Sequence, residues 1–172
     1  MKKVFLAGGC FWGVQAAFDL LIGVGKTASG YCAGHLENPT YEEVCQKTSG
    51  HTEAVEIHYD ENIIQLNNVL DLFFKIHDPY QVGGQGNDIG PQYRSGIYWE
   101  KGDFLLQEEI EQYFEKNKEL KSKMTTELKQ IKNFWTAEEY HQKYLVKNPL
   151  GYCHINLFEV KNYLLIKGLL KK

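Results

Sequence analysis

The chain has 172 residues and a net charge of -3, from 19 basic and 22 acidic side chains. This length fits one domain whose core needs neither a disulfide nor a metal to fold, and 43% hydrophobic residues exclude wholesale disorder. The slight acidity argues against a nucleic-acid-binding protein, which usually presents a basic face. The four cysteines contain no Cys-x-x-Cys pair and are too sparse for a secreted disulfide scaffold. We therefore expect reduced thiols, a cytoplasmic location and no membrane association.

Alternating and helical patterns divide the first half of the chain into short strands and helices. Apolar residues recur at helical spacing after Cys10, which predicts a buried helix that ends at the glycines of 23–25. Thr40 and Glu43 have the spacing of a capping box, so a short helix should begin behind Thr40. The strands expected in this half are 2–7, 26–31 and 53–59.

The second half predicts longer helices and one long loop. Apolar side chains between 66 and 74 form a helical stripe, and a long helix is predicted over 103–124. The loop 77–92 is rich in glycine, and loops of this length in compact domains are often functional. The remaining elements expected are a strand at 93–99, a strand or hairpin over 125–134 and a helix over 137–146.

This order of elements predicts an α+β fold. We expect a two-layer sandwich of the split-βαβ (ferredoxin-like) type, with extra loops and a C-terminal extension. No repeat or low-complexity linker divides the sequence, so residues 1–172 should form a single domain. The apolar and basic tail 160–172 fits a docked terminal segment.

Cys10 follows two glycines at a predicted strand-to-helix turn. The free N–H groups and partial positive charge of a helix start stabilise a thiolate, so Cys10 is a candidate nucleophile. The alternative is a small buried residue in a turn. Phe11 and Trp12 could wall an apolar pocket beside it. Phe11 could also be core, whereas Trp12 lies off the buried stripe and needs a ligand or a loop to cover it.

Glu53 heads the apolar face of the strand predicted over 53–59. Such a carboxyl is either an edge residue that reaches water or a buried acid with a raised pKa. A buried acid near a thiol would be a proton donor at neutral pH.

Three further polar residues could have either a functional or a purely structural role. Tyr93 heads a face like that of Glu53, and Tyr41 lies in the first turn behind the capping box. Asp88 lies in the glycine-rich loop, where an aspartate often only holds a turn. Spacing alone does not decide among these roles.

The six histidines show no paired metal-ligand spacing, so the sequence predicts no metal site. A Cys–His hydrolase is a second hypothesis, with His51 or His141 as the base. A non-enzymatic module that binds peptides in a pocket at Trp12 is a third.

Taken together, these residues resemble the peptide-methionine (S)-S-oxide reductase family, methionine sulfoxide reductase A. The motif around Cys10, GCFWG, is similar to the signature of that family. Other matching blocks follow in family order over most of the chain. They are NPTY at 38–41, GHTEAV at 50–55, QGND at 85–88, QYRS at 92–95 and KNP at 147–149.

The resemblance implies a role for each polar candidate. Cys10 would attack the sulfoxide sulfur, and Glu53 would protonate the sulfoxide oxygen. Tyr41 and Tyr93 would form hydrogen bonds to that oxygen, while Asp88 would orient water or the substrate backbone.

The resemblance also implies the substrate and the reaction. Phe11 and Trp12 would hold the ε-methyl group of methionine sulfoxide, free or in oxidised proteins, and the S epimer would be reduced. We expect a monomeric repair enzyme for oxidative damage, with no bound cofactor and no metal.

A second thiol would complete the cycle. Cys153 matches the block in which many members carry the cysteine that resolves a sulfenic acid at Cys10, and a dithiol such as thioredoxin, or dithiothreitol in vitro, would then reduce the disulfide. The sequence after Cys153 has fewer glycines than many members, which predicts a stiffer tail that limits how easily Cys153 swings to Cys10. Direct reduction of the sulfenic acid is the alternative. Cys45 is expected to be buried filler, and Cys32 has no assigned role.

Overall fold

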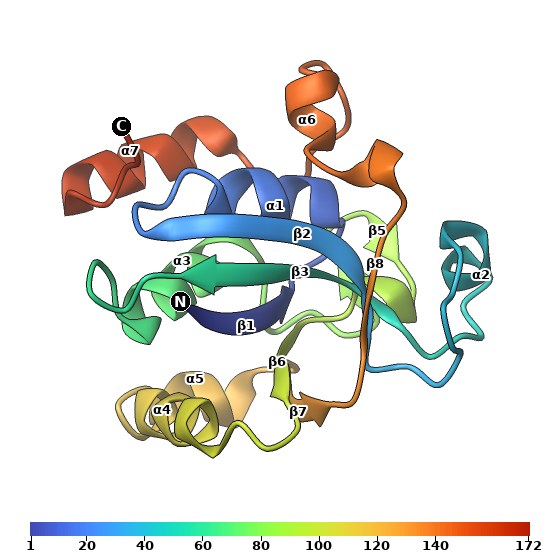
Figure 1. Cartoon of the computed structure of the whole chain (residues 1–172), viewed down its shortest axis with the longest axis horizontal. Helices are drawn as coiled ribbons and strands as arrows, with labels where there is room; N and C mark the ends of the chain where they lie inside the picture. The colour runs from blue at the N-terminus through green and yellow to red at the C-terminus, as the bar shows by residue number, and fades with distance from the viewer.

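The computed structural model describes residues 1–172 and has a mixed α+β fold (Figure 1). One six-stranded sheet runs in the order β7-β6-β1-β3-β2-β8. A separate two-stranded hairpin, β4 with β5, lies in the predicted long loop. The strands are β1 (Lys2–Ala7), β2 (Val24–Cys32), β3 (Thr52–Tyr59), β4 (Gly84–Gln85), β5 (Asp88–Ile89), β6 (Gly96–Glu100), β7 (Glu127–Ile131) and β8 (Phe134–Thr136).

The sheet curls so that its two edges approach each other. β7 pairs with β6 at one edge and β8 pairs with β2 at the other. Only Lys132 and Asn133 separate β7 from β8 along the chain, and two residues cannot cross a flat sheet of this width. Phe5 and Phe134 lie 5.0 Å apart between ring centroids on the inner face. Of the two alternatives predicted over 125–134, the strand is confirmed by β7. The hairpin is wrong, because β7 and β8 do not pair with each other.

The helices cover the outer face of the curled sheet. The main core joins the side chains that β1, β3 and β6 direct to this outer face with the apolar sides of α1, α3, α4 and α7. Figure 1 shows α1 and α7 along one side of the sheet and α4 with α5 along another. The α-helices are α1 (Phe11–Phe18), α2 (Tyr41–Cys45), α3 (Leu66–Ile76), α4 (Phe104–Glu115), α5 (Lys118–Lys123), α6 (Tyr144–Lys147) and α7 (Leu157–Lys167), with 3-10 helices η1 (Pro91–Tyr93) and η2 (Glu139–His141).

Local sequence signals place most elements of the first half of the chain correctly, although α1 ends at Phe18, before the predicted end at 23–25. The strand predicted over 2–7 is β1. The capping box is confirmed, because the Thr40 hydroxyl accepts from the Glu43 N–H and the Glu43 carboxylate accepts from the Thr40 N–H. The terminal segment docks as predicted: Val160 and Leu164 of α7 are buried, and Leu170 forms a β-bridge with Leu21.

Three other predicted elements differ in the structure. The strand predicted from 93 begins at Gly96, because Tyr93 ends η1. The long helix predicted over 103–124 divides where the Asn117 side chain donates to the Tyr113 carbonyl, 2.8 Å away, at the end of α4.

The helix predicted over 137–146 is replaced by η2 and the short α6. The Gln142 amide bonds the backbone N–H and C=O of Ser29, both at 2.9 Å, and so ties this segment to β2. Lys143 adopts a left-handed conformation (φ 53°), which a continuous helix cannot contain. No helix is both long and apolar enough to span a bilayer.

Candidate active site

Cys10 lies where β1 ends and α1 begins. It is the N-cap residue of α1 and is 8% exposed. Gly9 precedes it with a φ of +92°, which an L side chain rarely adopts. The turn therefore places the thiol at the start of α1, near the Trp12 N–H.

Glu53 extends from β3 to the start of the same helix. Its carboxylate accepts a hydrogen bond from the Phe11 N–H at 3.1 Å, and the side chain is 2% exposed. Burial raises the pKa of Glu53 to about 8, the Phe11 N–H opposes this rise, and the charge of Asp88 adds to it. Glu53 is thus a buried acid that is largely protonated at neutral pH, and not an edge carboxylate in water.

The Cys10 thiol differs from the sequence expectation. Burial raises its pKa well above the ordinary value of a thiol, and the charge of Glu53 adds to this rise. The Trp12 N–H at the helix start lowers the pKa, in the expected direction, but burial outweighs it. In the resting protein Cys10 is therefore a thiol and not a thiolate.

Tyr41 and Tyr93 approach this pair from two other segments. Both side chains are half-buried. Burial is the main cause that raises the pKa of each hydroxyl, and the charge of Glu53 raises it further. The Tyr41 N–H donates to Glu138 at 2.9 Å, which holds the start of α2. The two phenols stay protonated and can donate hydrogen bonds near Glu53.

Asp88 lies on β5 and forms a hydrogen bond with Tyr152, the residue before Cys153. Its carboxylate accepts a hydrogen bond from the Tyr152 hydroxyl at 3.0 Å. The charge of Asp88 also contributes to the raised pKa of both Cys10 and Glu53. The glycine-rich loop thus brings an acid to the same end of the sheet.

Trp12 is covered by the segment between β8 and α7. Its indole stacks on Tyr144 with 3.7 Å between centroids and an interplanar angle of 9°. The indole N–H donates to His141 Nδ1 at 3.0 Å. Phe11 is 1% exposed and belongs mainly to the core, where its ring lies 5.7 Å from that of Tyr31.

Cys153 lies beside α1. A Cβ built on Gly13 would come within 3.1 Å of the Cys153 sulfur. The thiol is half-buried and donates to the Ile155 carbonyl at 3.1 Å. All four cysteines are free.

Comparison with known proteins decides the family. The profile of the family described as "Peptide methionine sulfoxide reductase" matches residues 2–168. The chain is 50% identical to a peptide methionine sulfoxide reductase MsrA of Clostridium perfringens over 158 residues, 91% of this chain and 99% of that one. The chain belongs to the methionine sulfoxide reductase A family.

Solved structures of the family superpose on the fold. Reduced Mxr1 from Saccharomyces cerevisiae matches with a TM-score of 0.77 and 36% identity, over 88% of each chain. Mxr1 in complex with Trx2 matches with a TM-score of 0.53 and 27% identity, over 83% of this chain and 84% of that one.

The structure adds residues to the candidate site whose contacts there sequence patterns did not indicate. His141 and Tyr144 hold Trp12, Glu138 holds Tyr31 and Tyr41, and Tyr152 bonds Asp88. All of these lie in a segment that was predicted as an ordinary helix or as the flank of Cys153. Two signals were available: His141 was a candidate base for the hydrolase hypothesis, and Tyr152 precedes Cys153 in the chain.

Two of the cysteines also differ from each other in environment. Cys45 is partly exposed and lies near the Tyr41 hydroxyl, so the expectation of a buried filler is wrong. Cys32 is fully buried on the inner face of the sheet, with Phe5 and Tyr98. Cys32 therefore cannot meet a substrate in this fold.

The histidines do not form a hydrolase site with Cys10. His51 Nδ1 accepts from the Gly34 N–H at 3.1 Å and Nε2 contacts the Leu36 carbonyl at 2.6 Å, so both nitrogens are occupied. His141 Nδ1 is occupied by Trp12, and its Nε2 has no partner. No cluster of three or more His, Cys, Asp or Glu side chains could hold a metal ion.

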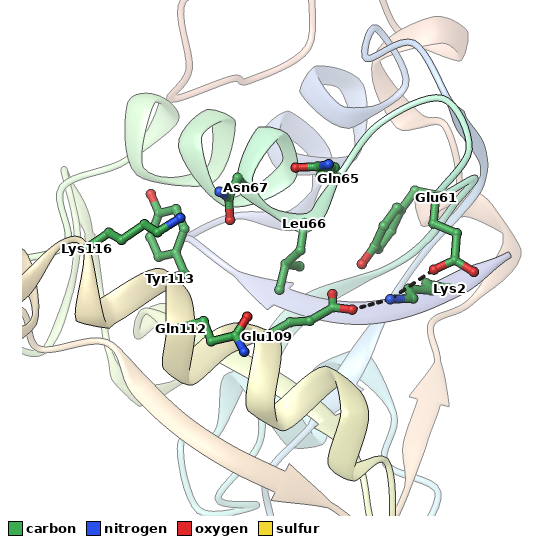
Figure 2. Close-up of a pocket in the computed structure, with 10 residues that line it drawn as sticks. Lys2, Glu61, Gln65, Leu66, Asn67, Glu109, Gln112, Tyr113 and Lys116 are labelled. Carbon is green, nitrogen blue, oxygen red and sulfur yellow. Dashed lines mark hydrogen bonds and ion pairs between the residues drawn. The ribbon is translucent and has the colours of Figure 1, made fainter.

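A surface hollow of about 360 Å³ lies at the opposite end of the sheet. Figure 2 shows Lys2 in this hollow, paired with Glu109 and Glu61. Lys2 pairs in register with Tyr59, the last residue of β3, whereas Glu53 lies at the start of that strand. This hollow is separate from the Cys10 site.

Proposed function

We propose that this protein reduces the S epimer of methionine sulfoxide, free and in oxidised proteins, to methionine, and so repairs oxidative damage. The contact between Glu53 and the first turn of α1 carries the proposal, because it holds a protonated carboxyl beside a thiol in a buried site. Membership of the family supports the substrate class. A sulfoxide oxygen leaves readily only when it is protonated, so an acid and a nucleophile are needed together.

The first step transfers the oxygen to Cys10. The Cys10 sulfur forms a bond to the sulfoxide sulfur while Glu53 protonates the oxygen and the S–O bond of the substrate breaks. The hydroxyl oxygen then bonds to the Cys10 sulfur, the S–S bond breaks, and methionine leaves. Cys10 ends as a sulfenic acid, and its thiol proton restores Glu53. Sulfoxide and thiol thus become thioether and sulfenic acid, and the thiol itself is the reductant.

Three groups of side chains orient the substrate in this proposal. Tyr41 and Tyr93 donate to the sulfoxide oxygen, since both phenols stay protonated. Trp12 and Phe11 hold the ε-methyl group, and Tyr144 and His141 fix the Trp12 ring. Asp88 orients water or the substrate backbone. Because the oxygen, the methyl group and the attacking sulfur each have a fixed place, only one configuration at the sulfoxide sulfur fits the site.

The second step regenerates Cys10. The Cys153 thiol attacks the sulfenic acid sulfur, its proton leaves with the hydroxyl as water, and a Cys10–Cys153 disulfide forms. An external dithiol then reduces this disulfide, dithiothreitol in vitro and thioredoxin in the cell. The Mxr1–Trx2 complex supports a thioredoxin as the reductant.

The remaining parts of the proposal concern the whole chain. We infer a single catalytic domain that acts as a monomer in the cytoplasm without a bound cofactor, since the redox chemistry uses thiols alone. The strand order β6-β1-β3-β2 with antiparallel neighbours supports the split-βαβ class for the central part of the fold.

The experiment measures the methionine that is formed, with dithiothreitol as reductant, from a mixture of the two epimers of methionine sulfoxide. Cys10→Ser should abolish the activity, and Glu53→Gln should lower kcat/KM about 100-fold or more. Glu108→Gln removes an exposed carboxyl of α4 and should change nothing. A Cys10→Ser variant that binds the sulfoxide and functions unchanged would favour the peptide-binding module. Full activity in Glu53→Gln would remove the acid role.

A further inference from the structure

His154, the residue after Cys153, makes a specific bond to the turn that carries Cys10. Its Nε2–H donates to the Gly8 carbonyl at 2.9 Å. The other ring nitrogen, Nδ1, is buried without a partner, and burial lowers the pKa of the ring. The Gly8 carbonyl is therefore the one hydrogen-bond partner of the ring within the protein.

The glycines on either side of Cys10 make room for this segment. A Cβ on Gly9 would lie 2.9 Å from His154 Nε2, and a Cβ on Gly13 would lie 3.1 Å from the Cys153 sulfur. The imidazole and the thiol thus occupy the space that two side chains would otherwise fill. Cys153 is also close enough to contribute to the raised pKa of Cys10.

The chain after His154 is anchored as well. Ile155 is 7% exposed and packs into the main core, where its side chain also contacts Gly13. Asn156 caps α7, since its side chain accepts from the N–H groups of Phe158 and Glu159. Cys153 therefore precedes three consecutive anchored residues, and it does not belong to a free tail.

We propose that His154 is a positioning residue for the resolving step, holding Cys153 beside the first turn of α1 through its bond to the Gly8 carbonyl. The inference rests on the proposed role of Cys153 as the resolving thiol. With the loop anchored, the Cys153 thiol is held beside the helix that Cys10 caps, so a tail poor in glycine is an aid to the reaction. The step itself joins the Cys153 sulfur to the Cys10 sulfur and releases water.

The experiment separates the two steps in a single turnover without an external thiol. The reduced protein is mixed with methionine sulfoxide, quenched with an alkylating agent, and analysed for released methionine, sulfenic acid and disulfide. In His154→Leu, methionine release should be unchanged, while the Cys10–Cys153 disulfide should form about tenfold more slowly and the sulfenic acid should accumulate. His154→Gln keeps a donor to the Gly8 carbonyl and should behave like the unchanged protein.

Other outcomes overturn the proposal. Equal rates of disulfide formation in all three proteins would do so, as would a Gln variant as slow as the Leu variant. Slower methionine release in His154→Leu would mean that His154 supports the chemistry of Cys10 and not the resolving step. If His154→Leu does not fold, His154→Asn, whose amide is too short for the bond, replaces it. Absence of the disulfide in the unchanged protein would instead refute Cys153 as the resolving thiol.

Discussion

The charge state of Glu53 is the residue-scale feature on which the proposed chemistry depends. Short-range patterns indicated both Cys10 and Glu53 as candidates, because a glycine pair before a helix and a carboxyl on an apolar strand face are local signals. They gave the wrong protonation state for Cys10, since burial depends on segments far away in the sequence. The contacts of His141 and Tyr144 with Trp12 were missed for the same reason.

The raised pKa of Glu53 has a consequence for stability. The folded protein holds this proton up to about pH 8, whereas the unfolded chain releases it near the ordinary value of 4.5. Between these values the unfolded state binds fewer protons, so the free energy of unfolding falls as pH rises and levels off above pH 8. Glu53→Gln cannot ionise. It should therefore gain stability over the unchanged protein from pH 5 to pH 9, on the order of a few kcal/mol.

Urea unfolding at the two pH values, in the presence of a reductant, measures this gain. The exposed Glu108→Gln should follow the unchanged protein at both pH values. If Glu53→Gln and the unchanged protein differ in free energy of unfolding by the same amount at both pH values, then Glu53 is ionised in the fold at neutral pH.

At the scale of elements, periodicity predicted those segments whose partners lie close by. The capping box before α2 and the strand β1 formed as expected. The helix predicted over 137–146 did not form, because Gln142 bonds the backbone of Ser29 more than a hundred residues earlier. The bonds of Gln142 hold the segment so that His141 and Tyr144 contact Trp12, and the loss of the predicted helix therefore completes the candidate site.

Helix α7 provides a test of the docked terminal segment. Leu164 is fully buried against the core, and its neighbour Leu165 is 65% exposed. Leu164→Ala should lower the free energy of unfolding by about 2 to 4 kcal/mol, because it leaves a cavity. Leu165→Ala should change it by less than about 0.5 kcal/mol. Urea unfolding measures both, and equal effects would contradict the docking of α7.

At the scale of the whole molecule, the curl of the sheet could not be predicted from the sequence. The pattern over 125–134 predicts strands, but whether β7 and β8 pair with each other depends on distant partners, β6 and β2. The curl places the helices on one face and leaves the turn after β1, the start of β3 and η1 at one end. That end gathers Cys10, Glu53 and Tyr93, while the hollow at Lys2 lies at the other.

The most direct test of the proposed activity uses the separated epimers of methionine sulfoxide. Fully reduced protein, without any external thiol, is incubated with each epimer, and methionine is quantified. The S epimer should give about one methionine per protein molecule, because the thiol of Cys10 supplies the electrons for one turnover, and the R epimer should give none. No methionine from the S epimer, or equal amounts from the two epimers, would contradict the account.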